Sequence, residues 1–518
     1  MPLGLYISVP FCRTKCSYCN FASDVFSKSA YENYVVRLLE DIANSHQLAS
    51  ELGCAFGLTN DDTADSIYLG GGTPSILDAP QLMRIFAAVR DQFTVTPDAE
   101  ITVECAPGTL TPALIETLLL CGVNRVSLGV QSFVDQEAQS VGRLHKRSTV
   151  LEEIGRLRES GLGNINIDLI AGLPHQTAER WAFSVSETIA AGVPHVSVYM
   201  LEVDEDSRLG RELIAGGARY HAHFVPDDDA TADFYQQACQ TLASAGIAQY
   251  EISNFARVAP RNRKLQSNQS RHNLKYWTRQ PYLGFGVDAH SMLEPIPLMN
   301  GRASSPVRVG TAALGCPAER SSAAARGPSN ALDARARVGT GALARPSRAQ
   351  LGSGPSNPGF ARAVASIESD RHQAIRFATP DSLDAYMNRA PHTITPVSTQ
   401  AAIEESFFLG LRLNRGIDLE RLRTESSLWQ GHDFSRATNA AQKTALAAGA
   451  TRRRQQEVSC ETVAAWDSAI KQSMREGLLE QQGTTLHLTA RGRLLSNEVF
   501  ARFLTEETKV GTGHVNPR

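Results

Sequence analysis

Short apolar runs alternate with longer amphipathic segments from residue 3 to about residue 252. Six of the apolar runs have the length and β-rich composition of strands: Leu3–Val9, Ser66–Leu69, Glu100–Cys105, Arg125–Gly129, Asn164–Ile170 and His195–Met200. The segments between them have helical spacing, among them Tyr31–Asn44, Pro80–Gln92, Pro112–Cys121, Val150–Glu159 and Ala178–Ala190. This alternation predicts βαβ units and a parallel sheet, and therefore an α/β fold of the partial (β/α)6 barrel kind. Sites in such folds lie at the carboxyl ends of the strands.

The pattern changes at residues 303–366, which are rich in Ala, Gly, Ser, Pro and Arg. The stretch contains eight arginines, no lysine and only two acids, Glu319 and Asp333. Its low hydrophobicity and many chain breakers predict a disordered insertion, and a basic tail for an anionic partner is the alternative. Residues 1–302 are then expected to form the barrel and the region that follows it.

A second module is expected in residues 367–518, with its structure starting near Ile375. Helical patterns at Ala401–Leu411 and Cys460–Glu476 are followed by a short hairpin, the motif Leu-Thr-x-x-Gly at Leu488–Gly492, and another helix. This order resembles an α+β winged-helix-like domain, although the fold alone does not decide a function. A polar insertion near 424–456, with three consecutive arginines, interrupts the module and is expected to be a solvated loop.

Composition narrows the class of protein. At 518 residues the chain is long enough for two or three domains. A net charge of −3 gives no overall basic field, so nucleic acid is not an expected partner. No apolar run approaches the ~18 residues that span a bilayer, and the first residues lack the pattern of a secretory signal. Nine cysteines in no pairing pattern indicate a reducing, cytoplasmic compartment.

Three of the cysteines, Cys12, Cys16 and Cys19, lie in one short loop after the first expected strand. Thiolates at this C-x3-C-x2-C spacing can hold three irons of a cubane [4Fe-4S] cluster, whereas electron-transfer clusters have four cysteine ligands. The position two residues after Cys19 is Phe21, so the fourth iron is expected to be open to an exogenous ligand. A zinc knuckle is the alternative, but zinc usually takes four ligands from C-x2-C pairs, and no second pair follows in the sequence.

The loop resembles that of the radical S-adenosylmethionine (SAM) superfamily. The resemblance implies that the amino and carboxylate groups of SAM chelate the open iron, and that a 5′-deoxyadenosyl radical results when the reduced cluster donates an electron. Gly70–Pro74, which reads GGGTP after the second strand, resembles the superfamily's motif that contacts the SAM amino group. Its glycines would let a ligand approach the backbone closely.

Polar residues at successive strand ends complete this pattern. Glu104 and Gln131 end or follow the third and fourth strands and offer hydrogen-bonding groups, while the Arg143 guanidinium suits a carboxylate. Asp168 is an acid within an apolar strand, which is costly to bury unless it is paired, and ribose hydroxyls would suit it. Each residue alone could be a structural hydrogen bonder, but their joint order favours a SAM site.

The motifs together resemble one family, the oxygen-independent coproporphyrinogen III oxidases and their HemW-type relatives. The resemblance covers most of residues 3–302 and 375–505 and rests on Tyr6–Cys12, Gly70–Pro74, Gly129–Phe133, Asp168–Pro174 and Leu488–Glu498. It implies that SAM is contacted by Tyr6, Gly71, Gly72, Thr73, Glu104, Gln131, Arg143, Asp168 and Met200. Met200 would act mainly through its backbone.

Two departures from the oxidases favour the HemW type. The oxidases have a further cysteine where this chain has Phe21, and they carry an extension before the first strand, for which there is no room ahead of Cys12. The HemW resemblance implies a heme chaperone that binds the cluster, SAM and heme and delivers heme to apo-hemoproteins. The alternatives are radical oxidative decarboxylation of coproporphyrinogen propionates and, with less support, a redox-sensing winged-helix regulator.

A further motif, H-N-x-x-Y-W from His272 to Trp277, also occurs in HemW-type proteins. In that context His272 is the leading heme-ligand candidate, the aromatic pair could stack on the porphyrin, and Arg271 or Lys275 could meet a propionate. His290 is a weaker candidate ligand. The alternative is a core histidine that packs against nearby aromatic side chains.

The resemblance also implies partners. Heme is the expected cargo, apo-hemoproteins are the expected acceptors, and a flavodoxin or ferredoxin is the ordinary electron donor. Homodimerisation, a peripheral membrane contact and the question whether the protein is an enzyme stay open at this point.

Overall fold

The computed structural model describes residues 1–504 apart from 55, 57–61, 259–267, 296–372 and 426–459. The disordered insertion expected at 303–366, and nearly all of the polar insertion expected near 424–456, therefore lie outside the described residues. None of the helices in the described ranges is both long and apolar enough to cross a membrane.

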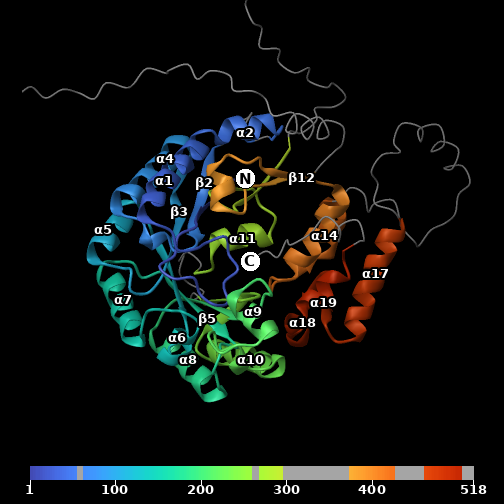
Figure 1. Cartoon of the computed structure of the whole chain (residues 1–518). Coiled ribbons are helices and arrows are strands. Elements are labelled where there is room, and N and C mark those ends of the chain that lie inside the picture. The colour runs from blue at the N-terminus through green and yellow to red at the C-terminus, as the bar shows by residue number, and fades with distance from the viewer. Residues whose placement is uncertain (55, 57–61, 259–267, 296–372, 426–459, 505–518) are drawn as a thin grey trace, which may run out of the picture. The chain divides into compact units, whose positions relative to one another are not determined.

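Six parallel strands lie side by side in the order in which they occur along the chain. They are β1 (Leu3–Val9), β2 (Thr63–Gly71), β3 (Thr94–Cys105), β4 (Arg125–Gln131), β5 (Ile165–Ala171) and β6 (His195–Met200). The helices that run around the outside of these strands (Figure 1) include α1 (Lys28–Ala43), α4 (Ala79–Gln92), α5 (Pro112–Leu120), α6 (Asp135–Ser140), α7 (Arg147–Glu159) and α8 (Ala178–Ala190). The expected α/β alternation is therefore confirmed.

The sheet is wider than the sequence pattern predicts. Within the described residues it has twelve strands, in the order β12-β11-β10-β9-β1-β2-β3-β4-β5-β6-β8-β7. One addition is the hairpin of β7 (Ile247–Glu251) and β8 (Asn254–Arg257), which continues the sheet beyond β6. On the other side lie β9 (Tyr282–Phe285), β10 (His290–Leu293), β11 (Ala374–Ala378) and β12 (Thr393–Val397). We expected a separate module to begin near Ile375, but the chain first returns to the main sheet there.

Local signals in the sequence set the beginnings of several helices. The Asp78 side chain accepts a hydrogen bond from the backbone of Gln81, whose side chain bonds back to Asp78, so α4 starts with a capping box. The hydroxyls of Thr111 and Thr177 cap α5 and α8 in the same position. Each cap satisfies a backbone N–H that has no partner within its helix.

Alternation along the strands separates an apolar outer face from a polar inner face. On β1 the side chains of Leu5, Ile7 and Val9 are fully buried, as are Tyr34 and Leu38 of α1. The alternate positions on β1 and on the neighbouring strands carry buried polar side chains, among them Ser8, Ser66, Thr102, Ser127, Asn166 and Ser197. Burial of apolar surface contributes about 25 cal/mol per Å² to the free energy of folding, so the helices pack on the apolar outer face. The polar side chains remain on the inner face.

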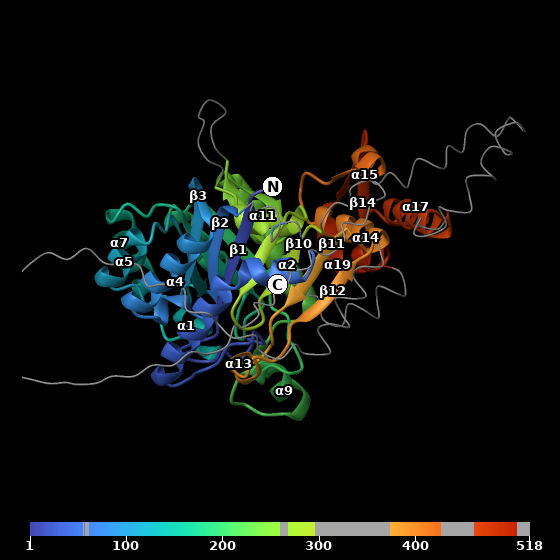
Figure 2. The same ribbon diagram turned by 90° about the horizontal axis from the view of Figure 1, so that it is seen from above.

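Helix α11 (Arg271–Trp277) lies inside the curve of the strands (Figure 1). It covers the end of the sheet at which the parallel strands begin. Glu100, near the middle of β3, accepts hydrogen bonds from the backbone N–H groups of Arg271 (2.8 Å) and His272 (3.2 Å). The buried Lys275 ammonium lies 2.8 Å from Asp65 Oδ1 and 2.8 Å from the carbonyl oxygen of Pro2. Figure 2 shows α11 beside the N-terminus and α9 (Arg208–Ala215) at the opposite end.

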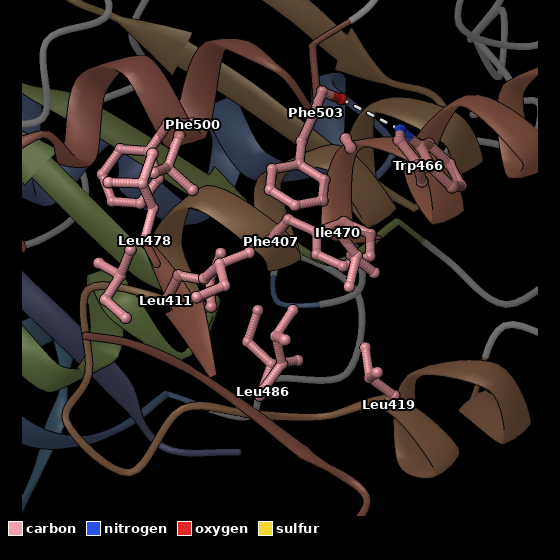
Figure 3. Close-up of a cluster of buried hydrophobic side chains, with 14 of the residues drawn as sticks. Phe407, Leu411, Leu419, Trp466, Ile470, Leu478, Leu486, Phe500 and Phe503 are labelled. Atoms are coloured by element: carbon pink, nitrogen blue, oxygen red, sulfur yellow. Dashed lines mark hydrogen bonds between the residues drawn. The ribbon is translucent and has the colours of Figure 1, made fainter. Parts of the chain in front are cut away.

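The C-terminal residues form a small α+β module. Its three-stranded antiparallel sheet has the order β13 (Ile417–Asp418), β15 (Thr485–Leu488), β14 (Leu479–Gln482). Its helices are α14 (Thr399–Gly410), α15 (Leu419–Glu425), α17 (Cys460–Arg475), α18 (Ala490–Leu494) and α19 (Ser496–Ala501). In its core (Figure 3) the rings of Phe407 and Phe503 stack at 4.5 Å, and Trp466 Nε1 donates to the Phe503 carbonyl at 3.1 Å. The helix–hairpin–helix order expected from the sequence is present.

The C-terminal module is joined to the main sheet by backbone hydrogen bonds. The N–H of Ile252, just after β7, donates to the Arg412 carbonyl at 2.9 Å, and that of Asn414 donates to the Tyr250 carbonyl at 2.9 Å. Ile252 also belongs to the same hydrophobic cluster as Phe407. The module therefore packs directly against one edge of the sheet.

Candidate functional site

The three cysteines lie in the loop that leaves β1, where the structure supplies hydrogen-bond donors to their sulfurs. Cys16 is buried, and Cys12 and Cys19 are half-buried. Thr73 Oγ1 donates to Cys12 Sγ at 3.8 Å, and Arg143 Nη1 donates to Cys16 Sγ at 3.8 Å. Burial raises the pKa of the Cys12 and Cys19 thiols. A positive group bound at the loop would offset that cost by favouring the thiolates.

The GGGTP segment, which begins in the last two residues of β2, bonds to the backbone of the cysteine loop. The N–H groups of Gly72 and Thr73 donate to the carbonyls of Val9 and Phe11, each at 2.8 Å. A Cβ on Gly72 would lie 2.7 Å from both of those oxygens, so no larger residue fits there. The loop's composition is thus explained by its close approach to the backbone that carries Cys12.

Glu104 ends β3 on the inner face. Its carboxylate accepts a hydrogen bond from the Tyr68 hydroxyl at 2.8 Å, and a Cβ on Gly70 would lie 3.0 Å from it. Burial raises the pKa of Glu104 to about 7, against the opposing effect of the hydrogen bond from Tyr68. The side chain therefore changes charge near neutral pH, and a nearby cation would fix it as the carboxylate.

Gln131 and Arg143 lie where β4 ends. Gln131 has a positive φ of 69°, at an irregularity in the pairing of β4 with β5, which turns the strand end. The Arg143 guanidinium lies against Gly129 and donates to its carbonyl. Its Nε is buried without a hydrogen-bond partner among the described residues. Such a donor beside the cysteines suits an anionic ligand.

Asp168 on β5 is held by neighbouring polar side chains. It accepts hydrogen bonds from Ser127 Oγ at 3.0 Å and from Asn166 Nδ2 at 2.7 Å. Burial raises the pKa of Asp168 despite these bonds. On the next strand Met200 pairs with Ala171, the last residue of β5. Tyr6 lies on β1, half-buried, with its ring 6.2 Å from that of Tyr68.

The nine residues expected to contact SAM thus belong to six consecutive strands or to the loops at their ends. Among the described residues, no three His, Cys, Asp or Glu side chains gather closely enough to hold a single metal ion. A cubane binds each thiolate at a different iron, so its ligands need not meet at one point. The donors to sulfur, the Gly72 contact and the unpartnered Arg143 Nε fit an iron–sulfur cluster with an anionic ligand beside it.

His272, the leading heme-ligand candidate from the sequence, has both ring nitrogens engaged inside the protein. Its side chain is 1% exposed at the amino end of the strands. Nδ1 lies 3.2 Å from Ser66 Oγ, and Nε2 lies 2.7 Å from the Tyr276 hydroxyl. Burial, with the nearby Lys275 cation, lowers its pKa to about 3, so the ring stays neutral. The alternative of a core histidine with aromatic neighbours is the one the structure favours.

The other residues of that motif are also engaged within the protein. Trp277 is buried, and the Arg412 guanidinium lies 4.4 Å from the centre of one of its rings. Arg271 pairs with Asp98 at 3.4 Å. His290, the weaker heme candidate, is different, because its side chain is 57% exposed at the start of β10, with Nε2 3.8 Å from Asp288 Oδ1.

Several partners in the site were not foreseen from the sequence. Tyr68 holds Glu104, while Ser127 and Asn166 hold Asp168. Each lies on the polar face of a strand, so the two-residue alternation that placed Glu104 and Asp168 also marks these positions. Their individual roles depend on contacts between strands and are visible only in the structure.

The fold and the site define a class of protein. Residues 6–185 match the radical SAM superfamily. The structure of coproporphyrinogen III oxidase (HemN) from Escherichia coli superposes with a TM-score of 0.63, covering 97% of this chain and 90% of that one. At 19% sequence identity this likeness establishes a shared fold.

Sequence comparison is more specific. The heme chaperone HemW of Lactococcus lactis subsp. lactis (strain IL1403) is 33% identical over 299 residues, which are 58% of this chain and 72% of that protein. HemW of Escherichia coli (strain K12) is 34% identical over 290 residues, 56% of this chain and 70% of that protein. The chain belongs to the HemW heme chaperone family of radical SAM proteins.

Proposed function

We propose that the protein binds heme and delivers it to apo-hemoproteins, with a [4Fe-4S] cluster and SAM as resident cofactors. The relatives that carry the name heme chaperone HemW support this proposal. The observation that carries it within the chain is Phe21, which stands where the oxidases resembled by the sequence have a further cysteine. Its carbonyl accepts a hydrogen bond from Lys15 Nζ at 2.6 Å, which closes the loop on itself.

We assign the cluster to Cys12, Cys16 and Cys19, and the SAM-binding surface to the rim around them. Bound there, a reduced cluster would supply one-electron chemistry at the SAM sulfonium. Arg143 is suited to the SAM carboxylate, the GGGTP backbone and Glu104 to its amino group, and Asp168 to its ribose hydroxyls. Tyr6, Gln131 and Met200 complete the proposed surface.

Coproporphyrinogen decarboxylation is the second candidate function. The likeness to the oxidase structure supports a shared fold, and the proposed SAM surface is common to both functions. The two candidates therefore differ at Phe21 and in the substrate that is bound. An assay of turnover and an assay of heme binding are both needed to separate them.

The deciding experiment uses the full chain after anaerobic reconstitution. Incubation with coproporphyrinogen III, SAM and a reductant is expected to give no protoporphyrinogen, while heme titration is expected to give a saturable Soret band. Clear turnover would support the oxidase. A protein that binds no heme would contradict the chaperone function, whatever the turnover assay shows.

The remaining partners follow from this function. We infer that heme passes to apo-hemoproteins and that a flavodoxin or ferredoxin supplies electrons to the cluster. The described cysteines are all free thiols, which fits a reducing compartment such as the cytoplasm. Transfer of heme from the chain to an acceptor apo-protein, followed by the acceptor's own Soret spectrum, tests the delivery step.

A further inference from the structure

Two histidines far apart in the sequence meet near the carboxyl ends of the strands. His175 follows β5, and His221 precedes the short helix η2 (Ala222–Phe224). His175 Nε2 lies 3.3 Å from His221 Nδ1, and both residues have positive φ angles, 67° and 62°. Neither belongs to the proposed cluster or SAM surface.

We propose that His221, oriented by His175, is the axial ligand of the heme iron. This inference rests on the proposed function and names the residue that would hold the cargo. A histidine ring nitrogen is a common ligand of heme iron. His272, which the sequence favoured for this role, has both ring nitrogens engaged inside the protein.

The pair has the geometry of a ligand and its orienting partner. If His221 donates its Nδ1 proton to His175 Nε2, its own Nε2 carries a free lone pair. Within the described part of the chain, His221 makes its side-chain hydrogen bond through Nδ1, and Nε2 has no partner. Ligating histidines typically donate their other N–H to an acceptor, which fixes the tautomer and raises the basicity of the ligating nitrogen. Burial, then the nearby His221 and Arg180, lowers the pKa of His175, which favours the neutral ring that can accept this proton.

The surroundings suit a porphyrin. The Phe224 ring stacks on His175 with 4.2 Å between ring centres, and its side chain is 57% exposed, which offers an apolar surface for the macrocycle. The Arg180 guanidinium donates to the His175 carbonyl at 3.2 Å and has further N–H groups for a propionate. An exposed surface of this kind also suits a chaperone, because an acceptor can reach the cargo.

The pair is connected to the cysteine loop by packing. Leu173, two residues before His175, shares a small hydrophobic cluster with Tyr18, which lies between Cys16 and Cys19. Helix α9 holds the segment before η2 through Glu212, whose carboxylate accepts from the N–H groups of Tyr220 (2.8 Å) and Ala222 (3.1 Å). The N–H of Leu209 in the same helix donates to the Ser17 carbonyl at 2.8 Å. Heme at His221 would therefore sit beside the cluster loop.

The test compares heme binding by the cluster-loaded full chain and three variants, His221→Asn, His175→Asn and His223→Asn. Asparagine tolerates the positive φ at the first two positions better than most residues. We expect His221→Asn to weaken heme binding by about 100-fold and to remove the EPR signature of histidine ligation. His175→Asn should weaken binding by about tenfold and shift the Soret band, as loss of an orienting partner does. His223→Asn changes an exposed residue of η2, two positions after His221, and should behave as wild type.

A second variant guards against misfolding. His221→Gly removes the ring without a backbone penalty at positive φ, and added imidazole should restore the ligated spectrum. Unchanged spectra in His221→Asn and His221→Gly, with wild type binding heme, would overturn the ligand assignment but leave the chaperone function standing. A wild-type protein that binds no heme would overturn both. Co²⁺ binding that requires both histidines and leaves heme binding unaffected would identify a metal-ion site instead and overturn the assignment.

Discussion

The two ends of the barrel are both polar, but their polar groups are satisfied in different ways. At the amino end, Glu100 lies 3.8 Å from the buried Arg125 guanidinium and also receives the first N–H groups of α11. His272 has a partner at each ring nitrogen. At the carboxyl end, Arg143 has a buried Nε without a partner among the described residues, and Glu104 titrates near pH 7.

This difference distinguishes buried polar groups that stabilise the fold from buried polar groups that are available to a ligand. Buried polar groups that are paired within the protein stabilise one arrangement of the strands, whereas incompletely paired groups are costly unless something else pairs with them. We therefore expect His272 at the amino end to contribute to stability and Glu104 at the carboxyl end to contribute to ligand binding. Substitutions at the two ends should separate these effects.

The largest effect is expected at the carboxyl end from Cys16→Ala. Loss of one of three thiolates should reduce the iron content from about four per chain to near zero after reconstitution. Iron and sulfide analysis measures this directly. Cys239→Ser, which changes a half-buried thiol of α10 (Asp228–Ser244), should retain the full cluster. Equal iron content in Cys16→Ala and wild type would contradict the assigned ligand set.

At the amino end, His272→Ala should cost stability and leave ligand binding intact. The change leaves a cavity in a fully buried site, and the hydroxyls of Ser66 and Tyr276 lose their hydrogen-bond partner. We therefore expect the free energy of unfolding to fall by about 2–4 kcal/mol. Chemical denaturation measures the change, and the exposed His223→Ala provides the control, with an expected effect below about 0.5 kcal/mol. If His272→Ala instead abolishes the Soret band of bound heme without loss of stability, the contrast between the two ends is wrong.

The smallest effect concerns the charge of Glu104. Because its pKa is about 7 without ligand, only the carboxylate form present at higher pH would pair with the SAM amino group. SAM affinity should rise by about tenfold between pH 6 and pH 8, and Glu104→Gln should flatten this dependence. Equilibrium dialysis of reconstituted protein measures it, with Glu116→Gln on the exposed face of α5 as the control. A wild-type affinity that does not change with pH would remove Glu104 from the proposed site.

The same raised pKa has the opposite sign for folding. The native state binds the Glu104 proton more tightly than the unfolded chain does. Its contribution to stability is therefore full below the unfolded pKa of about 4.5 and is lost as the pH rises through about 7. Ligand binding and stability thus change in opposite directions over this interval.

Sequence periodicity was sufficient for the first six strands because each is bounded by turns and followed by an amphipathic helix. It also placed Glu104 at the end of β3 and Asp168 within β5, on strands whose carboxyl ends meet at one rim. Strand β11 was assigned to the wrong part of the fold, because nothing local tells a strand which distant partner it will join. Its pairing with β10 is determined by tertiary contacts and not by the local sequence.

Contacts between distant residues set the other limit. The motif around His272 indicated heme binding by resemblance, but the burial of that ring depends on Ser66 and Tyr276, and on strands that close around α11. His175 and His221 are 46 positions apart and form no recognisable spacing motif. Their proximity results from the way in which the loop after β5 meets η2.

The pairing of β10 with β11 has a consequence for how the chain can vary. Leu293 pairs with Ile375, so roughly eighty residues connect two adjacent strands. Loop-closure entropy grows only with the logarithm of length, so a connection of this size costs about 2–3 kcal/mol more than a five-residue hairpin loop if it is fully flexible. The antiparallel register fixes both ends of that connection. Residues can therefore be gained or lost between these strands at a modest entropic cost, while the cluster loop and the rim around it keep their positions.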